Sequence, residues 1–266
     1  MSPQASRPDG PDPAAALHAQ LESIREHLLA EPNDADALAR AAATLQELGR
    51  FDEAATHFER ALAALPTDAP SRRCDLLTQL GSCRAAAGAY AEAERCCHAA
   101  LAEAPDQAGP YLALGMLALE HGRTEKAERF YRVARELQPD HSEAHAALAM
   151  IAQQAERYEE AFDLYLQSLR CDSDNLVALL GLFQTSCQMG DFSQIIHYLE
   201  LYLAGHGNDA PVQFCLATLY ARQGRLEEAW NMTMQVLAAE PQKREAAELL
   251  AQLEDALAEA SCPWAD

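Results

Sequence analysis

The chain has few aromatic residues, few basic residues and no long apolar run. Aromatic side chains make up 6% of its 266 residues, and 20 Lys and Arg stand against 41 Asp and Glu, for a formal charge of −21. Strands favour β-branched and aromatic residues, whereas helices favour Ala, Leu, Glu, Gln and Arg. Because 49% of the residues are nevertheless hydrophobic, the composition predicts an ordered, mainly helical core.

The excess of acidic side chains disfavours nucleic acid and anionic membrane surfaces as partners, because like charges repel. No stretch of about 18 apolar residues is present, so we expect no transmembrane helix and no membrane insertion. The N-terminus carries Pro and Asp where a signal peptide needs a basic segment followed by an apolar one. This pattern predicts a cytoplasmic protein.

Sequence motifs of common enzymes are also missing. The chain contains no GxGxxG, GxxxxGK[ST], GxSxG or HExxH motif, so we expect no catalytic residues and no cofactor. Its eight cysteines include no CxxC pair, and no secretory context favours disulfides. We therefore expect most of them to be reduced core residues that bind no metal.

Prolines and glycines recur at a regular interval. Pro32 and Pro66 are 34 residues apart, and so are Pro105 and Pro139. Within each interval, two segments with helical periodicity flank a glycine, which is typical of the turn that ends a helix. In phase with the prolines are Gly49, Gly88, Gly122, Gly190 and Gly224, followed five places later by Ala54, Ala93, Ala127, Ile195 and Ala229. The pattern predicts repeated helical hairpins.

The spacing of large and small residues resembles the tetratricopeptide repeat. The third unit carries the pattern most fully, with Tyr111, Leu114, Gly115, Ala127, Tyr131 and Pro139 in the characteristic places. Small residues in such places let two helices approach closely. The resemblance implies an all-α, right-handed superhelical solenoid of about six helix-turn-helix repeats, with an N-terminal helix and a C-terminal capping helix.

The expected organisation follows from this phase. A disordered segment 1–11 precedes an N-terminal helix 12–31, and a solenoid over 32–240 is followed by a capping helix 241–260, which Pro241 starts, and a tail 261–266. Within the solenoid the expected repeats are 35–68, 74–107, 108–141, 142–175, 176–209 and 210–243. Terminal helices suit a solenoid, because its end units need polar caps.

Two repeat boundaries depart from the pattern. The interval from Pro66 to Pro105 is five residues longer than the period, which predicts a longer loop or an early helix start over 67–73. The fourth unit ends in Asp and Asn residues over 171–175 in place of a proline. Asp and Asn side chains make turns by local hydrogen bonding, so we expect a turn there as well.

The fifth unit departs furthest from the pattern. Phe183 and Ile195 replace residues that are small in the other units, so we expect altered helix packing in this unit. Gly181, two places before Phe183, is expected to offset part of the added bulk.

The resemblance implies that the first helices of the repeats line a concave groove. The first two repeats contribute polar residues to this groove. They lack the set of Lys, Asn and Arg side chains with which some relatives bind the C-terminal tails of chaperones. From Leu112 onward the groove is apolar and nearly uncharged, which favours binding of another protein as an amphipathic helix or an extended apolar peptide. The candidate groove residues are Leu112, Met116, Met150, Gln154, Leu180, Gln184, Phe214, Thr218 and Arg222, among which Gln154, Gln184 and Arg222 are expected to supply hydrogen bonds.

These features predict a non-catalytic scaffold or adaptor. One alternative for the groove is that neighbouring parts of the chain bury it. A second is self-assembly into homo-oligomers through bulky residues of the fifth unit, namely Ile195, Ile196, Tyr198, Leu199 and Leu201. A third is metal or redox chemistry at Cys96, Cys97 and His98, or at His141 and His145, whose spacing puts both imidazoles on one helical face.

Overall fold

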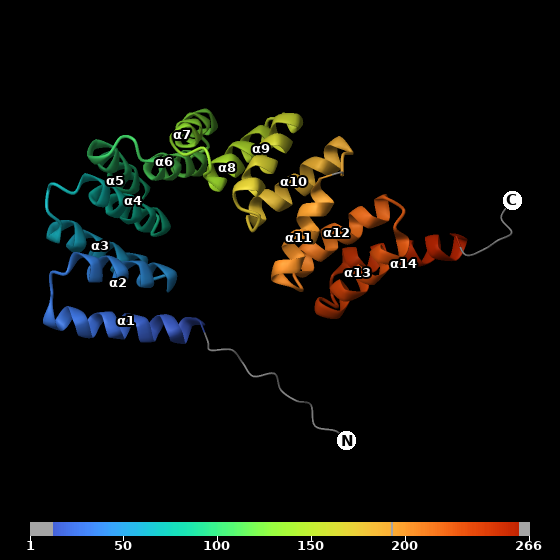
Figure 1. Ribbon diagram of the computed structural model, residues 1–266, viewed down its shortest axis with the longest axis horizontal. Coiled ribbons are helices and arrows are strands. Elements are labelled where there is room, and N and C mark those ends of the chain that lie inside the picture. Colours follow the sequence, from blue (N-terminus) through green and yellow to red (C-terminus); the bar gives the residue numbers. More distant parts are fainter. Residues whose placement is uncertain (1–12, 193, 261–266) are drawn as a thin grey trace, which may run out of the picture. The chain divides into compact units, whose positions relative to one another are not determined.

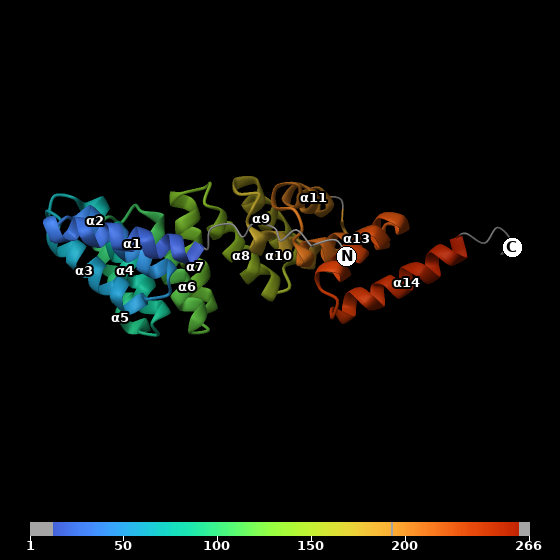
Figure 2. The ribbon, with the colours of Figure 1, turned by 90° about the horizontal axis from the view of Figure 1, so that it is seen from below.

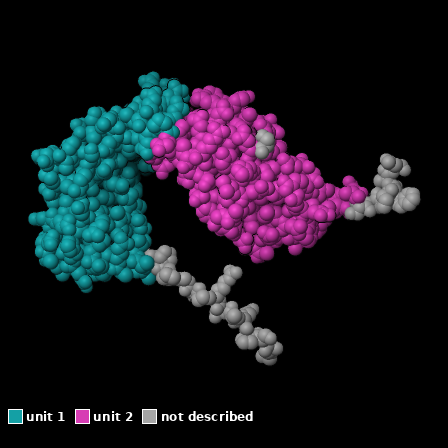
Figure 3. Space-filling model, viewed as in Figure 1, with its two compact units in different colours: residues 1–139 teal, residues 140–266 magenta. Residues whose placement is uncertain are grey.

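The computed structural model describes residues 13–192 and 194–260, and every regular element within them is an α-helix (Figure 1). The expected all-α fold class is confirmed. Fourteen helices in these residues pack as sequential antiparallel pairs, each helix contacting the next within its unit. The expected disordered segment 1–11 and the tail 261–266 lie outside the described residues. The chain divides into two compact units, residues 1–139 (unit 1) and residues 140–266 (unit 2; Figure 3).

Unit 1 contains an N-terminal helix and three helical hairpins. Leu21 and Ile24 of the first helix are buried against Ala41 and Leu45 of the second, which extends the core to the N-terminal end. Burial of this apolar stripe drives the docking of the first helix. The helices are α1 (Pro13–Ala30), α2 (Ala35–Glu47), α3 (Phe51–Ala64), α4 (Pro70–Ala86), α5 (Tyr90–Glu103), α6 (Ala108–Glu120) and α7 (Thr124–Leu137).

Unit 2 contains three further hairpins and a final helix that packs on α12 and α13 (Figures 1 and 2). Its helices are α8 (Ser142–Gln154), α9 (Tyr158–Cys171), α10 (Leu176–Met189), α11 (Ile195–His206), α12 (Ala210–Arg222), α13 (Leu226–Ala239) and α14 (Arg244–Ala260). The expectation that Pro241 starts the final helix is wrong. Pro241 lies in a turn closed by the bond from Lys243 N–H to the Glu240 carbonyl, and the helix begins at Arg244.

The turn within each hairpin depends on one residue with a positive φ angle. Gly49, for example, has a φ of 72°, and the following Arg50 N–H donates to the Leu45 carbonyl at 2.8 Å. Glycine adopts this left-handed conformation without strain, which explains its recurrence after the first helix. The fourth hairpin is the exception, because Glu156 occupies the same place with a φ of 58°.

Close approach of the paired helices explains the glycines inside them. A Cβ added to Gly115 of α6 would lie 2.7 Å from the ring of Tyr131 in α7, and one added to Gly81 of α4 would lie 3.1 Å from Cys97 Sγ in α5. Both distances are too short for ordinary van der Waals contact. The small residue and its larger partner are therefore complementary in volume.

The two repeat boundaries that depart from the pattern adopt structures that their local sequences explain. The five extra residues contribute an early helix start, because α4 begins at Pro70 and is longer than its counterparts. At the end of the fourth hairpin, Asp172 Oδ1 accepts from Asp174 N–H at 3.0 Å, and Asn175 Oδ1 accepts from Ala178 N–H at 3.0 Å. The expected turn by Asp and Asn side chains is confirmed.

The fifth hairpin is altered, as its bulky residues predict. Its second helix, α11, begins only at Ile195, where the other second helices are already three residues long, and α10 packs more extensively on α9 than on α11. The expectation that Gly181 offsets bulk within this hairpin is wrong. A Cβ at Gly181 would overlap the ring of Tyr165 in the preceding helix α9, so the glycine makes room for that ring.

We expect Gly115→Ala to lower the free energy of unfolding by roughly 1–3 kcal/mol, because the ring of Tyr131 cannot move aside in a packed core. Gly109→Ala is the matched control in the same helix, since its added Cβ would lie 3.7 Å from Thr78 Cγ2, an ordinary contact. Urea denaturation followed by circular dichroism measures both. Equal effects of the two substitutions would contradict the steric argument.

Candidate functional site

Unit 2 contains a groove of about 610 Å³ between α8 and α10, closed on one side by α9. Four of the sequence-predicted residues line it: Met150 and Gln154 from α8, and Leu180 and Gln184 from α10. Further lining comes from Gln153, Tyr158, Tyr165, Val177, Gly181 and Gln188. The same face of two neighbouring helices therefore forms one continuous surface.

The ring of Tyr165 forms the floor of this groove. It is 1% exposed and occupies the space that Gly181 leaves open. Its hydroxyl donates to Gln153 Oε1 at 2.7 Å, and Gln153 Nε2 donates to Gln184 Oε1 at 3.1 Å. Burial raises the pKa of Tyr165 to about 12, so the phenol stays a proton donor at neutral pH. The hydrogen bonds thus fix the positions of the two amides.

The groove combines apolar side chains with side-chain amides and has no charged residue among its lining residues. Val177 is 54% exposed and Met150 is 38% exposed, so both apolar side chains are accessible. Amides such as those of Gln184 and Gln188 can donate and accept hydrogen bonds. This arrangement suits a ligand that presents apolar side chains together with unpaired peptide groups.

Three other predicted residues lie on α12 and do not line this groove. Phe214 is half-buried, and the ammonium nitrogen of Lys243 lies 5.3 Å from its ring centre. Thr218 Oγ1 donates to the Phe214 carbonyl at 2.9 Å within the helix, and the Arg222 guanidinium lies 5.5 Å from the ring centre of Phe192. Neighbouring residues of unit 2 therefore contact Phe214 and Arg222, although Phe214 stays half-buried and Arg222 exposed.

The remaining two predicted residues belong to unit 1. Leu112 is half-buried in α6, and Met116 of the same helix is 45% exposed. Neither lines the groove of unit 2, whose lining comes from α8, α9 and α10 alone.

Sequence reasoning missed the contribution of Tyr158 and Tyr165 to the lining. Both belong to α9, a second helix of its hairpin, whereas the resemblance assigns the groove to first helices. A signal for Tyr165 was present, because it has the aromatic place of the fourth unit and Gly181 follows in the next helix. That the glycine admits this particular ring depends on contacts between successive hairpins.

Four cysteines of the described residues lie in surroundings that disfavour redox chemistry. Cys97 is fully buried, and burial raises the pKa of its thiol to about 12. Burial also raises the pKa of Cys83 and of Cys215 to about 11 each, and that of the half-buried Cys96 in the same direction. The reactive form of cysteine is the thiolate, so burial suppresses the reactivity of these groups at neutral pH.

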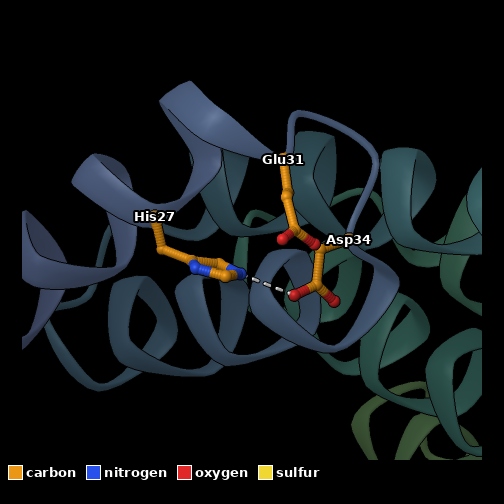
Figure 4. Close-up of side chains that lie close together, drawn as sticks. All are labelled: His27, Glu31 and Asp34. Carbon is orange, nitrogen blue, oxygen red and sulfur yellow. Dashed lines mark hydrogen bonds and ion pairs between the residues drawn. The ribbon is translucent and has the colours of Figure 1, made fainter.

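Among residues 13–192 and 194–260, one group of side chains lies close enough together to ligate a metal ion, and the sequence did not predict it. His27 at the end of α1 meets Glu31 and Asp34 of the following loop, with their ligating atoms within 4.8 Å of one another (Figure 4). Within the described ranges, neither Cys96, Cys97 and His98 nor His141 and His145 form part of such a group.

The contacts of Asp34 indicate that this group has a structural role, in which it joins the end of α1 to the start of α2. His27 Nε2 lies 2.8 Å from Asp34 Oδ2 (Figure 4), and Asp34 Oδ1 accepts from the backbone N–H groups of Asp36 and Ala37 at 2.9 and 3.1 Å. The hydrogen bond to His27 and the backbone bonds lower the pKa of Asp34. Its carboxylate thereby caps α2 and holds the end of α1 beside it.

The helical hairpins and the groove between their first helices define an all-α helical-repeat protein. Comparison with family models is specific: residues 84–151 and 188–253 match one tetratricopeptide repeat model, and residues 35–68 match a second. The chain belongs to the tetratricopeptide repeat family, whose members are generally scaffolds for protein interactions. No curated protein matches the chain. No described helix has the length and apolarity needed to cross a membrane.

Solved structures with the same fold come from diverse proteins. PilF from Pseudomonas aeruginosa is 20% identical, with a TM-score of 0.66 over 82% of this chain and 97% of that one. A repeat protein from Cytophaga hutchinsonii is 16% identical, with a TM-score of 0.57 over 88% and 95% of the two chains. A chain of the APC/C hetero-tetramer Cut9–Hcn1 is 17% identical, with a TM-score of 0.64 over 91% of this chain and 46% of that one. This chain thus spans under half of the last protein, and such likenesses show the fold alone.

We expect alkaline pH to destabilise the protein partly through Tyr165. Its pKa of about 12 in the folded state lies above the value near 10 of an exposed tyrosine. The stability it contributes is therefore complete below about pH 10 and is lost as the pH rises through about 12. Tyr165→Phe should reduce the decline by up to about 1.4 kcal/mol per pH unit. Urea denaturation between these pH values tests this, and identical slopes for both proteins would contradict it.

We expect alkylation by iodoacetamide to separate the cysteines by exposure. Cys171 is exposed, whereas Cys83, Cys97 and Cys215 are buried. The buried thiols should react about tenfold or more slowly, since both access and thiolate formation are suppressed. Mass spectrometry of timed digests measures the rates. Rapid labelling of Cys97 in the folded protein would revive the redox alternative.

Proposed function

We propose that this chain is a non-catalytic scaffold or adaptor that binds a segment of a partner protein in the groove between α8 and α10. The family relationship supports the general role, and the groove supports the particular site. Its exposed apolar side chains lie beside glutamine amides, which can pair with the backbone of an extended peptide or with polar side chains of an amphipathic helix. We also propose that the protein is located in the cytoplasm.

A single observation supports this site most strongly. In a chain with a formal charge of −21, the lining of this groove contains no charged residue. Accessible apolar surface costs solubility, and exposed apolar patches on soluble proteins tend to mark interaction sites. The groove is therefore well suited to bury apolar groups of a partner.

Self-assembly through the fifth hairpin has less support. Ile195, Ile196 and Leu199 are buried in unit 2, and Tyr198 is half-buried. Leu201 alone among the five bulky residues remains largely accessible, with 46% exposure. Most of the apolar surface that suggested an oligomer is thus used inside the unit.

We expect Val177→Glu to weaken binding of an apolar peptide about tenfold or more, because the carboxylate would lose water on contact with the peptide. A displayed library of short peptides, selected on the purified protein, provides the probe, and fluorescence anisotropy measures its dissociation constant. Leu176→Glu is the matched control, since Leu176 precedes Val177 in the same helical turn, is 37% exposed and does not line the groove.

Circular dichroism verifies that both variants keep their helices. The proposal requires a clear difference between the two substitutions. Retention of full affinity by Val177→Glu, or an equal loss in both variants, would place the peptide elsewhere. Failure of the library to yield any binding peptide would reject the groove as a peptide site.

A further inference from the structure

The turn between α8 and α9 borders the groove. Among the described residues, Glu156 in this turn is the only non-glycine residue with a positive φ angle. Gln154 and Tyr158, on either side of this turn, both line the groove. Glu156 between them has a φ of 58°, whereas the corresponding places of the other hairpins hold Gly49, Gly88, Gly122, Gly190 and Gly224. A side chain disfavours this left-handed conformation, so glutamate here costs stability.

The turn itself does not require a glutamate. Its backbone bonds match those of a glycine turn: Arg157 N–H donates to the Ala152 carbonyl at 2.9 Å, as Arg123 N–H donates to the Ala118 carbonyl at 2.8 Å after Gly122. Backbone strain that the fold does not need often accompanies function, so the side chain of Glu156 needs a separate explanation.

The carboxylate of Glu156 is available to a ligand. Glu156 is exposed, and no ion pair to its carboxylate is found among the described residues. The neighbouring Arg157 pairs instead with Glu160 at 2.6 Å. Glu159, on the other side of Arg157, is exposed as well. The segment that follows Gln154 therefore carries a net negative charge, because it holds three glutamates and one arginine over 156–160.

Two wider features add to the negative potential at this edge. Residues 140–266 contain 20 acidic and six basic side chains. The helices α8 and α10 both end near this edge, at Gln154 and Met189, and the C-terminal end of a helix attracts cations. The potential therefore favours a positive group beside the uncharged groove.

We propose that Glu156 makes the groove selective for partner peptides in which a Lys or Arg flanks the apolar segment. The apolar segment would occupy the groove beside Met150 and Val177, and the basic residue would pair with the Glu156 carboxylate at its edge. This inference rests on the proposed peptide-binding function and adds the charge of the partner. The strain at Glu156 is then the cost of placing a carboxylate at this position.

The test uses one apolar peptide selected from the library as the core. Two lysines, two glutamines or two glutamates are added either at its N-terminal end or at its C-terminal end, which gives six peptides. We expect the lysine form with the favoured end to bind roughly two- to fivefold more tightly than the glutamine form, the range of an exposed ion pair, and the glutamate form to bind more weakly than either. The preference should shrink in about 0.5 M salt, where screening is stronger.

Two substitutions separate the charge of Glu156 from its backbone strain. Glu156→Gln keeps the strained backbone and removes the charge, whereas Glu156→Gly removes both. Both variants should lose most of the lysine preference and retain affinity for the glutamine form. Glu156→Gly should also raise the melting temperature by roughly 2–4 °C, because glycine relieves the strain. Glu245→Gln on α14 makes the same change in net charge away from the groove and should keep the preference.

The outcomes distinguish this inference from the function on which it rests. If no core peptide binds, the groove is not a peptide site and both proposals fail. If a peptide binds but its lysine and glutamate forms bind equally, the selectivity is rejected and the groove remains. A rise in melting temperature with an unchanged lysine preference would show that Glu156 has no part in recognition.

Discussion

Helix pairs in this chain pack closely because a small residue on one helix faces a larger side chain on the other. Gly115 against Tyr131 and Gly81 against Cys97 are the clearest cases, with no room for a Cβ in ordinary contact. Packed interiors tolerate little change in volume, so each such pair restricts where its helices can cross. The 34-residue interval repeats this restriction along the chain, which is why successive hairpins resemble one another.

The same steric relation builds the candidate site in unit 2. Gly181 belongs to α10, yet the ring that occupies its space is Tyr165 of the preceding hairpin. The ring closes the floor between α8 and α10, and its hydroxyl begins the hydrogen bonds that position Gln153 and Gln184. Packing between hairpins and the polar chemistry of the groove thus depend on one aromatic residue.

Electrostatics divides this part of the molecule into distinct environments. The groove between α8 and α10 is uncharged, whereas the unit around it is strongly acidic. An uncharged lining accepts apolar side chains without leaving a buried charge unpaired. Carboxylates at the edge remain in water, so they can attract a positively charged ligand without the free-energy cost of burying an unpaired charge. The strained backbone at Glu156 is consistent with such a division.

The sequence by itself determined the helical hairpins, the turns at glycine, and the altered fifth unit, because these depend on neighbours close along the chain. It also identified Met150, Gln154, Leu180 and Gln184, which share the exposed faces of two first helices. Only the tertiary structure decided that Phe214 and Arg222 contact other residues of unit 2, and that Tyr165 forms a floor. Those outcomes depend on side chains from separate helices meeting in space, and helical periodicity specifies the face of a helix without specifying what covers it.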